Sequence, residues 1–303
     1  MNYPDLDALE ILNVIVEEGS FAKASERVHK TQSALSYQVK KLEQQLGCTL
    51  IDRSQYRTTL TPAGRTLLEE GRKLLRQARH LDALAGQLAQ GWEPRLLLVL
   101  DGILPQKPVL NALGTLSRAG IPTRVQLKTE FLGGVAYRFH QEKADLMVVK
   151  DYTPSQRLGE IALAEMDILL CAAADHPLAR QRALELWQLQ EHVELSVHDS
   201  SPAPGPIRDA RVFGCERVFF LSDFRAKEEA LLMGLGFGWL PAYLARDHIR
   251  SGRLRVLDYR HGSRYSFRPK LVYRLDTPLG PAAEKLLKAL RAHLGHKPED
   301  DKP

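Results

Sequence analysis

The sequence has few cysteines and no long apolar run, and each shortage excludes a class of protein. Its three cysteines, Cys48, Cys171 and Cys215, lie far apart and form no C-x-x-C pair. We therefore expect free thiols in a reducing compartment, without a disulfide framework or a zinc site. No apolar stretch reaches the roughly 18 residues that a membrane-spanning helix needs. The first residues carry acids where a signal peptide carries Lys or Arg, so a cytoplasmic protein without a membrane partner is expected.

Motifs for catalysis and for metal or cofactor binding are also scarce. The ten histidines show no metal-ligand spacing such as H-E-x-x-H. Residues 198–200 read His-Asp-Ser, but adjacent residues cannot form a catalytic triad, which a fold assembles from separate segments. Glycine alternates through 234–238 at the end of a predicted helix, whereas a dinucleotide-binding loop precedes one. We expect no catalytic residue, no metal and no cofactor.

Positive charge is present but concentrated in one segment. The net charge is +5, and residues 20–57 hold seven cations against three acids, which accounts for +4 of it. These cations are Lys23, Arg27, Lys30, Lys40, Lys41, Arg53 and Arg57. A basic cluster in one small module is typical of phosphate binding, although such a cluster can also be a solvated surface.

The same segment has the pattern of a helix-turn-helix. A helix is expected over 6–17, a second over 21–29 with Ser20 as its N-cap, and a third over 32–46 with Thr31 as its N-cap. In the third helix Leu35, Val39, Leu42 and Leu46 form one apolar stripe. The opposite side carries Ser33, Ser36, Tyr37, Lys40 and Gln44, which suit phosphates and base edges in a major groove.

A hairpin and a long helix are expected next. The β-prone residues 49–53 and 57–60 flank a polar turn, which predicts the wing of a winged helix, with Arg53 or Arg57 able to enter a minor groove. Thr61-Pro62 then begins a helix to about residue 90, a rod of roughly 42 Å at 1.5 Å per residue. Along it Leu67, Leu74, Leu81 and Leu88 recur every seven residues, each of the first three followed four residues later by Gly or Ala. This heptad seam predicts a dimer helix.

After residue 92 strand and helix patterns alternate, which predicts an α/β domain with a mostly parallel sheet. Strands are expected at 95–100, 124–128, 145–149, 167–173, 193–197, 217–221, 238–240 and 268–273. Helices are expected at 107–117, 135–141, 226–235 and 281–294. This pattern predicts that the chain builds one lobe, crosses to a second and returns. We divide it into a winged helix-turn-helix (1–61), a linker and dimerisation helix (62–91), an effector domain (92–296) and a flexible tail (297–303). Lobe one is 92–165 with 268–296, and lobe two is 166–267.

These residues resemble the LysR-type transcriptional regulators. The resemblance lies in EEGSFAKASERVHKTQSALSYQVKKLEQQLGCTLIDR, in LTPAG and in the long helix behind it, and more faintly in Asp175-His176-Pro177 and in 231–236 with Leu240-Pro241. It implies binding of pseudo-palindromic promoter DNA by dimers or dimers of dimers, contact with RNA polymerase, and an inducer held between the lobes of a periplasmic-binding-protein-like domain. Ser33 stands where Pro is frequent in the family and Tyr37 where Arg is frequent, so the operator cannot be carried over from relatives. The candidate DNA-binding residues are Lys30, Thr31, Gln32, Ser33, Ser36, Tyr37, Lys40, Lys41, Arg53 and Arg57.

The resemblance also locates candidate effector-binding residues. The loop after the first effector strand supplies Asp101, Gly102 and Ile103, the next edge Glu130, Phe131 and Leu132, and the second lobe Ser200, Ser201 and Asp223. The Asp101 carboxylate would repel a small dicarboxylate, so we expect an inducer that is not a simple dianion; alternatively Asp101 only caps the following helix. An α/β enzyme acting on a small metabolite, with incidental DNA affinity, is the alternative function.

Overall fold

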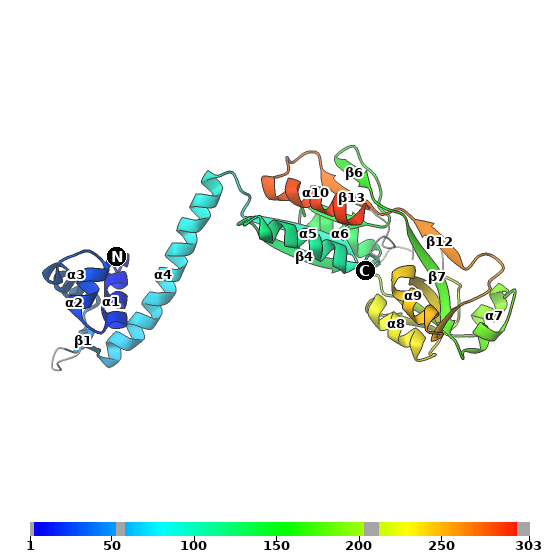
Figure 1. The fold of residues 1–303 in the computed structure, drawn as a ribbon, viewed down its shortest axis with the longest axis horizontal. Helices are drawn as coiled ribbons and strands as arrows, with labels where there is room; N and C mark the ends of the chain where they lie inside the picture. The colour runs from blue at the N-terminus through cyan, green and yellow to red at the C-terminus, as the bar shows by residue number, and fades with distance from the viewer. Residues whose placement is uncertain (1–2, 53–57, 203–211, 296–303) are drawn as a thin grey trace. The chain divides into compact units, whose positions relative to one another are not determined.

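The computed structural model describes residues 3–52, 58–202 and 212–295, and the chain folds into two compact units, Met1–Ala89 and Gln90–Pro303 (Figure 1). Arg53 and Arg57 of the expected wing, and the expected tail 297–303, lie outside the described residues. No described helix is both long and apolar enough to cross a membrane.

Unit one consists of three short helices, a two-stranded hairpin and one long helix. They are α1 (Leu6–Glu18), α2 (Phe21–Arg27), α3 (Gln32–Leu46), β1 (Ile51–Asp52), β2 (Thr59–Leu60) and α4 (Pro62–Ala89). Both predicted N-caps are confirmed: the Ser20 hydroxyl accepts from the Lys23 amide and the Thr31 hydroxyl from the Ala34 amide, each at 3.2 Å. α2 ends at Arg27 instead of His29, because His29 turns into the left-handed region with a φ of 53°. β1 and β2 pair antiparallel, as the hairpin prediction requires.

The apolar stripe of α3 anchors that helix in the core of unit one. Leu35, Val39 and Leu42 are fully buried, and Leu46 packs partly buried against the same cluster as α1. At the end of α3, the Glu43 carboxylate accepts hydrogen bonds from the amides of Leu50 (2.8 Å) and Ile51 (3.2 Å). The base of the hairpin is therefore fixed to α3.

The residues of the predicted heptad seam lie in two different environments along α4: the first ones pack on the core of unit one, and the later ones are exposed. Gly71 is buried against the Leu9 side chain of α1, and Leu67 packs partly buried on the same core. The interpretation of Gly71 as part of a self-association surface is therefore wrong, because α1 already occupies its side of the helix. Leu74, Leu81 and Leu88 are exposed. The guanidinium of Arg79 on α4 binds the Glu10 carboxylate of α1 through both oxygens at 2.9 Å.

Unit two contains two sheets, each covered by helices, which we call lobe one and lobe two. Lobe one has the strand order β4-β3-β5-β13-β6 and lobe two the order β11-β7-β10-β8-β9, with β12 also paired to β7. The strands of lobe one are β3 (Arg95–Asp101), β4 (Arg124–Glu130), β5 (Leu146–Val149), β6 (Leu158–Ala162) and β13 (Lys270–Arg274). Those of lobe two are β7 (Met166–Ala173), β8 (Glu194–Val197), β9 (Val218–Leu221), β10 (Phe237–Pro241), β11 (Leu254–Val256) and β12 (Arg264–Phe267).

Helices pack on both faces of each sheet. In lobe one α5 (Gln106–Arg118) and α10 (Pro281–Leu294) cover one face and α6 (Gly133–Gln141) the other. In lobe two α8 (Phe224–Leu232) and α9 (Ala242–Arg250) cover one face, with α7 (Leu186–Gln190) and the 3₁₀ turn η1 (Pro177–Arg180) on the other. The fold is therefore the expected α/β arrangement.

The expectation of mostly parallel sheets is wrong, because both sheets are mixed. β3 pairs parallel with β4 and β5, but β13 pairs antiparallel with both β5 and β6. In lobe two β8 pairs parallel with β9 and β10, whereas β7 pairs antiparallel with its neighbours. β7 and β13 are the strands that follow the two crossings between lobes, so they enter their sheets in the reverse direction.

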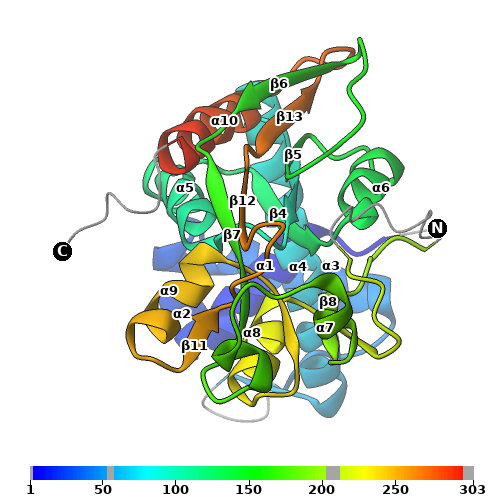
Figure 2. The same ribbon diagram turned by 90° about the vertical axis from the view of Figure 1, so that its right-hand side faces the viewer.

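The two crossings lie next to each other. The chain leaves lobe one between β6 and β7 and returns between β12 and β13, and Figure 2 shows β7 and β12 side by side. The Leu163 amide of the outgoing segment donates to the Pro269 carbonyl of the returning one at 2.9 Å. The two connecting segments are therefore hydrogen-bonded to each other where the chain passes between the lobes.

Candidate functional site

The side of α3 opposite its buried stripe is open to solvent and polar. Ser33, Lys40 and Gln44 are exposed, Ser36 is partly exposed, and 70% of Tyr37 is accessible. The helix thus presents hydroxyls, a phenol, an amide and an ammonium on one accessible face.

The start of α3 adds further polar groups to this face. The Thr31 hydroxyl, besides capping the helix, lies 3.1 Å from the Ser33 hydroxyl, and Gln32 is exposed beside them. Lys30 and Lys41 are exposed as well, and together with Tyr37 they line a groove between α3 and the start of α1. All eight described candidate DNA-binding residues therefore lie at the surface on or beside α3.

Unit two contains a pocket between its two lobes. It is partly open to solvent and is lined mainly by apolar and aromatic side chains with a few polar groups, as sites for small molecules commonly are. The lining residues are Asp101, Ile103, Phe131, Leu132, Lys150, Ile168, Ser196, Val197, Phe224, Lys227, Trp239 and Tyr265. Lobe one contributes the residues that follow the carboxyl ends of its parallel strands β3, β4 and β5, the place where open α/β sheets bind ligands.

Asp101 lies at this edge, but both of its carboxylate oxygens are already engaged by the backbone. One accepts from the Ile103 amide and the other from the Lys150 amide, each at 3.1 Å. Burial raises the pKa of Asp101 to about 6, and these two hydrogen bonds oppose that increase. The carboxylate therefore joins the loop after β3 to the end of β5. It does not cap α5, whose N-cap position is Pro105.

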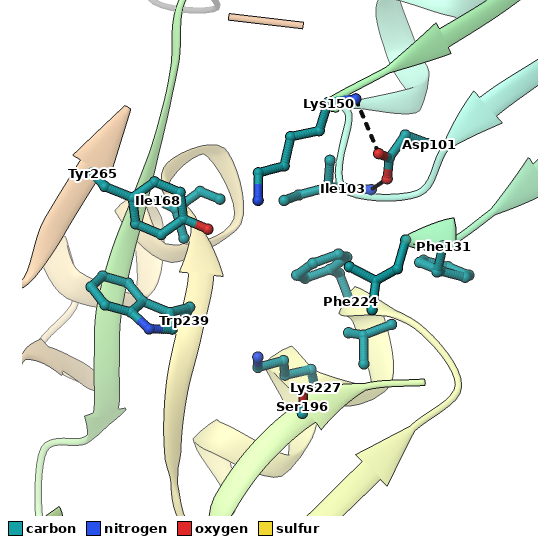
Figure 3. Close-up of a pocket in the computed structure, with 12 residues that line it drawn as sticks. Asp101, Ile103, Phe131, Lys150, Ile168, Ser196, Phe224, Lys227, Trp239 and Tyr265 are labelled. Atoms are coloured by element: carbon teal, nitrogen blue, oxygen red, sulfur yellow. Dashed lines mark hydrogen bonds between the residues drawn. The ribbon is translucent and has the colours of Figure 1, made fainter. Parts of the chain in front are cut away.

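Two lysines reach into the pocket, one from each lobe. Lys150 follows β5 and Lys227 lies on α8, and Figure 3 shows their side chains entering the same space from opposite walls. The Lys227 side chain is only 5% exposed and its ammonium lies 5.8 Å from the centre of the Phe224 ring. Gly238 leaves room for it, because a Cβ there would be 3.0 Å from the Lys227 Cε. Such depth is unusual for an ammonium, which loses much of its hydration there.

The remaining walls are mostly aromatic and aliphatic. Trp239 and Tyr265 pack edge to face with ring centres 5.0 Å apart, and the Lys150 ammonium lies 5.5 Å from the centre of the Tyr265 ring. Phe131 of lobe one and Phe224 of lobe two approach to 6.3 Å across the lobe boundary. Leu132 has a φ of 51°, an uncommon conformation for a non-glycine residue that often marks a binding site.

Five of the nine candidate effector residues lie outside the pocket lining. Gly102 supports it from behind: its amide donates to the Glu130 carbonyl, and the Phe131 ring occupies the space where a side chain would be. The Glu130 carboxylate binds Arg138 at 2.6 Å, within an ion-pair network between β4 and α6. The Asp223 carboxylate caps α8 by accepting from the Ala226 amide at 2.8 Å.

Ser200 and Ser201 belong to a contact between the lobes beside the pocket. The Ser200 hydroxyl accepts from the Phe131 amide at 2.9 Å, and the Ser200 amide donates to the Phe131 carbonyl at 3.3 Å. The Ser201 amide donates to the carboxylate of Asp199, two residues earlier, at 2.9 Å. Ser200 therefore holds the backbone of a pocket residue instead of facing the pocket.

The sequence prediction missed eight lining residues, of which Lys150 was within reach. Once β3 and β5 are expected as neighbouring parallel strands, the residue after β5 must lie beside Asp101. Lys227, Trp239 and Tyr265 come from three elements of lobe two, and only the packing of the two lobes brings them to lobe one. Across the described ranges no three His, Cys, Asp or Glu side chains gather as metal ligands.

Two known domain families match almost the whole chain. The family described as "Bacterial regulatory helix-turn-helix protein, lysR family" matches residues 6–65, and the family described as "LysR substrate binding domain" matches residues 89–295. The first includes α3 and its polar face, and the second includes every residue that lines the pocket.

Known transcriptional regulators are similar to this chain over most of its length. The HTH-type transcriptional regulator YeeY of Escherichia coli K12 is 34% identical over 254 residues, covering 83% of this chain and 82% of its own length. The HTH-type transcriptional regulator YhaJ of Escherichia coli O157:H7 is 32% identical over 255 residues, covering 83% and 85%. Among solved structures, an OxyR variant of Corynebacterium glutamicum shares the fold with a TM-score of 0.62 at 20% identity, covering 96% of this chain and 93% of its own.

Proposed function

Because the chain belongs to the LysR family of bacterial transcription regulators, we propose that α3 reads its operator and that the pocket of unit two holds its effector. The protein is a DNA-binding regulator with an effector-binding domain, and it is not an enzyme. What remains to be assigned is which residues carry out these tasks in this chain.

The observation that carries the DNA-binding assignment is the separation of the two sides of α3. Three residues of its apolar stripe are fully buried. This fixes the rotation of α3 about its own axis, so the opposite side of the helix faces outward. On that side Ser33 and Tyr37 can meet base edges, while Lys40 with Lys30 and Lys41 can bind phosphates. Gln32, Ser36 and Thr31 support the same contact at the start of the helix, and Arg53 and Arg57 are proposed for the wing.

The exposed leucines of α4 support self-association. Leu74, Leu81 and Leu88 recur every seven residues on a helix whose last buried residue is Leu75, so the second half offers an apolar seam to a second copy. We propose a dimer through residues 62–91, with Leu67 at the edge of that seam, or a dimer of such dimers. Binding beside a promoter in the cytoplasm would bring the regulator to RNA polymerase.

Binding to DNA from upstream of the gene tests this function. In a gel shift at physiological salt, the full chain should retard a specific upstream fragment at a much lower protein concentration than a scrambled fragment. The difference should be at least about 1,000-fold, because regulators typically bind specific sites roughly 10³–10⁷ times more tightly than non-specific DNA. Retardation of both fragments at the same concentration would contradict sequence-specific regulation.

A further inference from the structure

Lobe two carries a second concentration of positive charge, far in sequence from α3. Residues 242–268, which run from α9 through β11 to just beyond β12, hold seven arginines, no lysine and two aspartates, a net charge of +5 with His neutral. These arginines are Arg246, Arg250, Arg253, Arg255, Arg260, Arg264 and Arg268. The charge of this one segment is as large as the net charge of the whole chain.

Three of these arginines border a groove beside α9 and the edge of the lobe-two sheet. The residues that line it are Leu169, Arg246, Ile249, Arg250, Val256, Ser263 and Arg264. The Arg250 and Arg264 side chains are 79% and 64% exposed, and 41% of Val256 is accessible. We call this surface, together with Arg268 at the end of β12, the arginine groove. It combines guanidinium groups with apolar side chains, as protein-binding surfaces commonly do.

The acidic neighbours of the groove do not neutralise it. The Arg250 guanidinium donates to the Asp247 carboxylate at 3.1 Å, but 83% of the Asp247 side chain is exposed, so water screens this pair. Arg264 binds Asp167 on β7. A guanidinium has five N–H donors, so Arg250 can bind a further carboxylate without releasing Asp247. The groove therefore favours an acidic partner.

The segment after Gly295, which lies outside the described residues, has the complementary charge. Residues 299–301 read Glu-Asp-Asp, between Lys297 and Lys302. A carboxylate and a guanidinium pair through two parallel hydrogen bonds, a geometry that a lysine ammonium does not offer. Three consecutive acids thus match a surface whose cations are all arginines.

α10 ends beside the strands that border the groove. The Leu294 carbonyl accepts from the Ala164 amide at 3.0 Å, and Ala164 lies two residues before β7 begins. Farther along β7, Leu169 faces Arg264 of β12. Figure 2 shows α10 and α9 on the same side of unit two. The start of the acidic segment is therefore about one strand length from the groove.

The acidic segment is long enough to cover this distance. The five residue steps from Ala164 to Leu169 span roughly 17 Å at about 3.3 Å per step. Residues 299–301 are four to six steps beyond Gly295, so they reach roughly 13–20 Å when extended. Arg268 is nearer still, since its neighbour Phe267 pairs with Met166 at the start of β7. A segment tethered this closely meets its site at an effective concentration of about millimolar, so individually weak ion pairs are sufficient.

We propose that the acidic residues 299–301 bind the arginine groove on lobe two of the same chain. Since α10 belongs to lobe one, this contact connects the two lobes on the outer side of unit two, away from the pocket. It depends on exposed charges, so salt weakens it. The other candidate occupants are the same segment of a second copy and an acidic segment of another protein.

Zero-length cross-linking of the full chain tests the contact. A carbodiimide joins a lysine amine to a carboxylate that touches it, so Arg250→Lys and Arg264→Lys each introduce a reporter into the groove. Mass spectrometry of the digested monomer band should find the new lysine joined to Glu299, Asp300 or Asp301. The yield should exceed that of Arg182→Lys, an exposed control beside η1, by at least about tenfold, as the tethered concentration implies.

Three outcomes of the cross-linking would overturn the proposal. They are the absence of a link to residues 299–301 in both variants, an equal yield in Arg182→Lys, and a link found only between two chains, which would assign the groove to a second copy. A yield that stays unchanged in about 1 M salt, where the screening length is roughly 3 Å, would contradict a contact between exposed charges.

Proteolysis after Glu299 provides a second test that introduces no lysine. A Glu-specific protease should release residues 300–303 at least about tenfold faster from Arg250→Ser with Arg268→Ser than from the wild type, because the bound segment is protected. Arg118→Ser with Arg182→Ser removes two exposed arginines outside the groove and should leave the rate unchanged. Equal rates for all three proteins would overturn the proposal.

Discussion

At the scale of single residues, α3 separates the side chains that fold unit one from those that can meet DNA. Tyr37 and Lys40 are both exposed, so replacing either one removes no core contact. Their chemistry differs, since a phenol can read a base edge while an ammonium chiefly meets phosphate. Replacing Tyr37 and replacing Lys40 should therefore lower DNA affinity in different ways, one depending on the DNA sequence and the other on the salt concentration.

Lys40→Ala should weaken binding to operator and to random DNA equally, and should lower the slope of log affinity against log salt by about one. Tyr37→Ala should cost about 1–3 kcal/mol on the operator and little on random DNA. Fluorescence anisotropy at several salt concentrations measures both effects, with Lys288→Ala as a control outside unit one. Equal losses on both DNAs for Tyr37→Ala would contradict base reading.

Asp101 gives unit two a characteristic dependence on pH. Its pKa in the folded chain is raised to about 6, whereas an unfolded Asp titrates near 3.8. As the pH falls from 7 to 4.5, the folded chain takes up this proton before the unfolded chain does, so folding becomes relatively more favourable. The gain is about 2 kcal/mol at pH 4.5 and is lost again as the pH rises through 6.

The matching variant is Asp101→Asn, which cannot titrate. The free energy of unfolding of the wild type minus that of the variant should increase by about 2 kcal/mol between pH 7 and pH 4.5. Urea unfolding followed by tryptophan fluorescence reports this, because Trp92, Trp187 and Trp239 all lie in unit two. If the free energies of unfolding of the two proteins changed with pH in parallel, Asp101 would have an ordinary pKa.

At the scale of elements, α4 is the part whose role depends most on a second copy. Leu74 and Leu81 are exposed in the single chain, so Leu74→Glu with Leu81→Glu should leave unit one folded. Across a two-fold axis the change removes four leucines and adds four like charges. At about 1.5–3 kcal/mol for each buried leucine, the loss of four leucines should weaken the dimer by at least about 6 kcal/mol, or roughly 10⁴-fold.

Analytical ultracentrifugation at micromolar concentration checks this expectation, and circular dichroism confirms that the helices persist. Leu275→Glu changes a leucine of intermediate exposure between Leu74 and Leu81, but in unit two, and should leave the dimer intact. A double variant that remains dimeric with full helicity would exclude the seam as the dimer contact.

Elements with strong local signals were predictable from the sequence. The bounds of α3 and α10 agree with the prediction because a stripe of leucines and an N-cap Thr or an initial Pro mark them. α9 was missed because it begins after Pro241 without a side-chain cap. β11 and β12 were missed because their residues, Leu-Arg-Val and Arg-Tyr-Ser-Phe, contain no run of apolar side chains. The pocket was partly predictable for the same reason: Asp101, Ile103, Phe131 and Leu132 follow recognisable strands of lobe one. The residues from lobe two depend on how the lobes meet, which no local pattern encodes.

At the scale of the whole molecule, the structure suggests how a ligand could alter DNA binding. The lobes are joined by one pair of crossings and meet again where Ser200 holds the Phe131 backbone, with the pocket in between. A ligand that binds one lobe arrangement more tightly shifts the population toward it. In a dimer or a dimer of dimers, that shift would change the spacing of the α3 helices on DNA.

A hydroxyl-radical footprint of the full chain on upstream DNA tests the central claim most directly, namely that paired α3 helices read a specific operator. The account predicts two protected half-sites related by two-fold symmetry and separated by about 34 Å, one helical turn, or by a multiple of it. Uniform protection along the fragment, or one unpaired protected site, would contradict it.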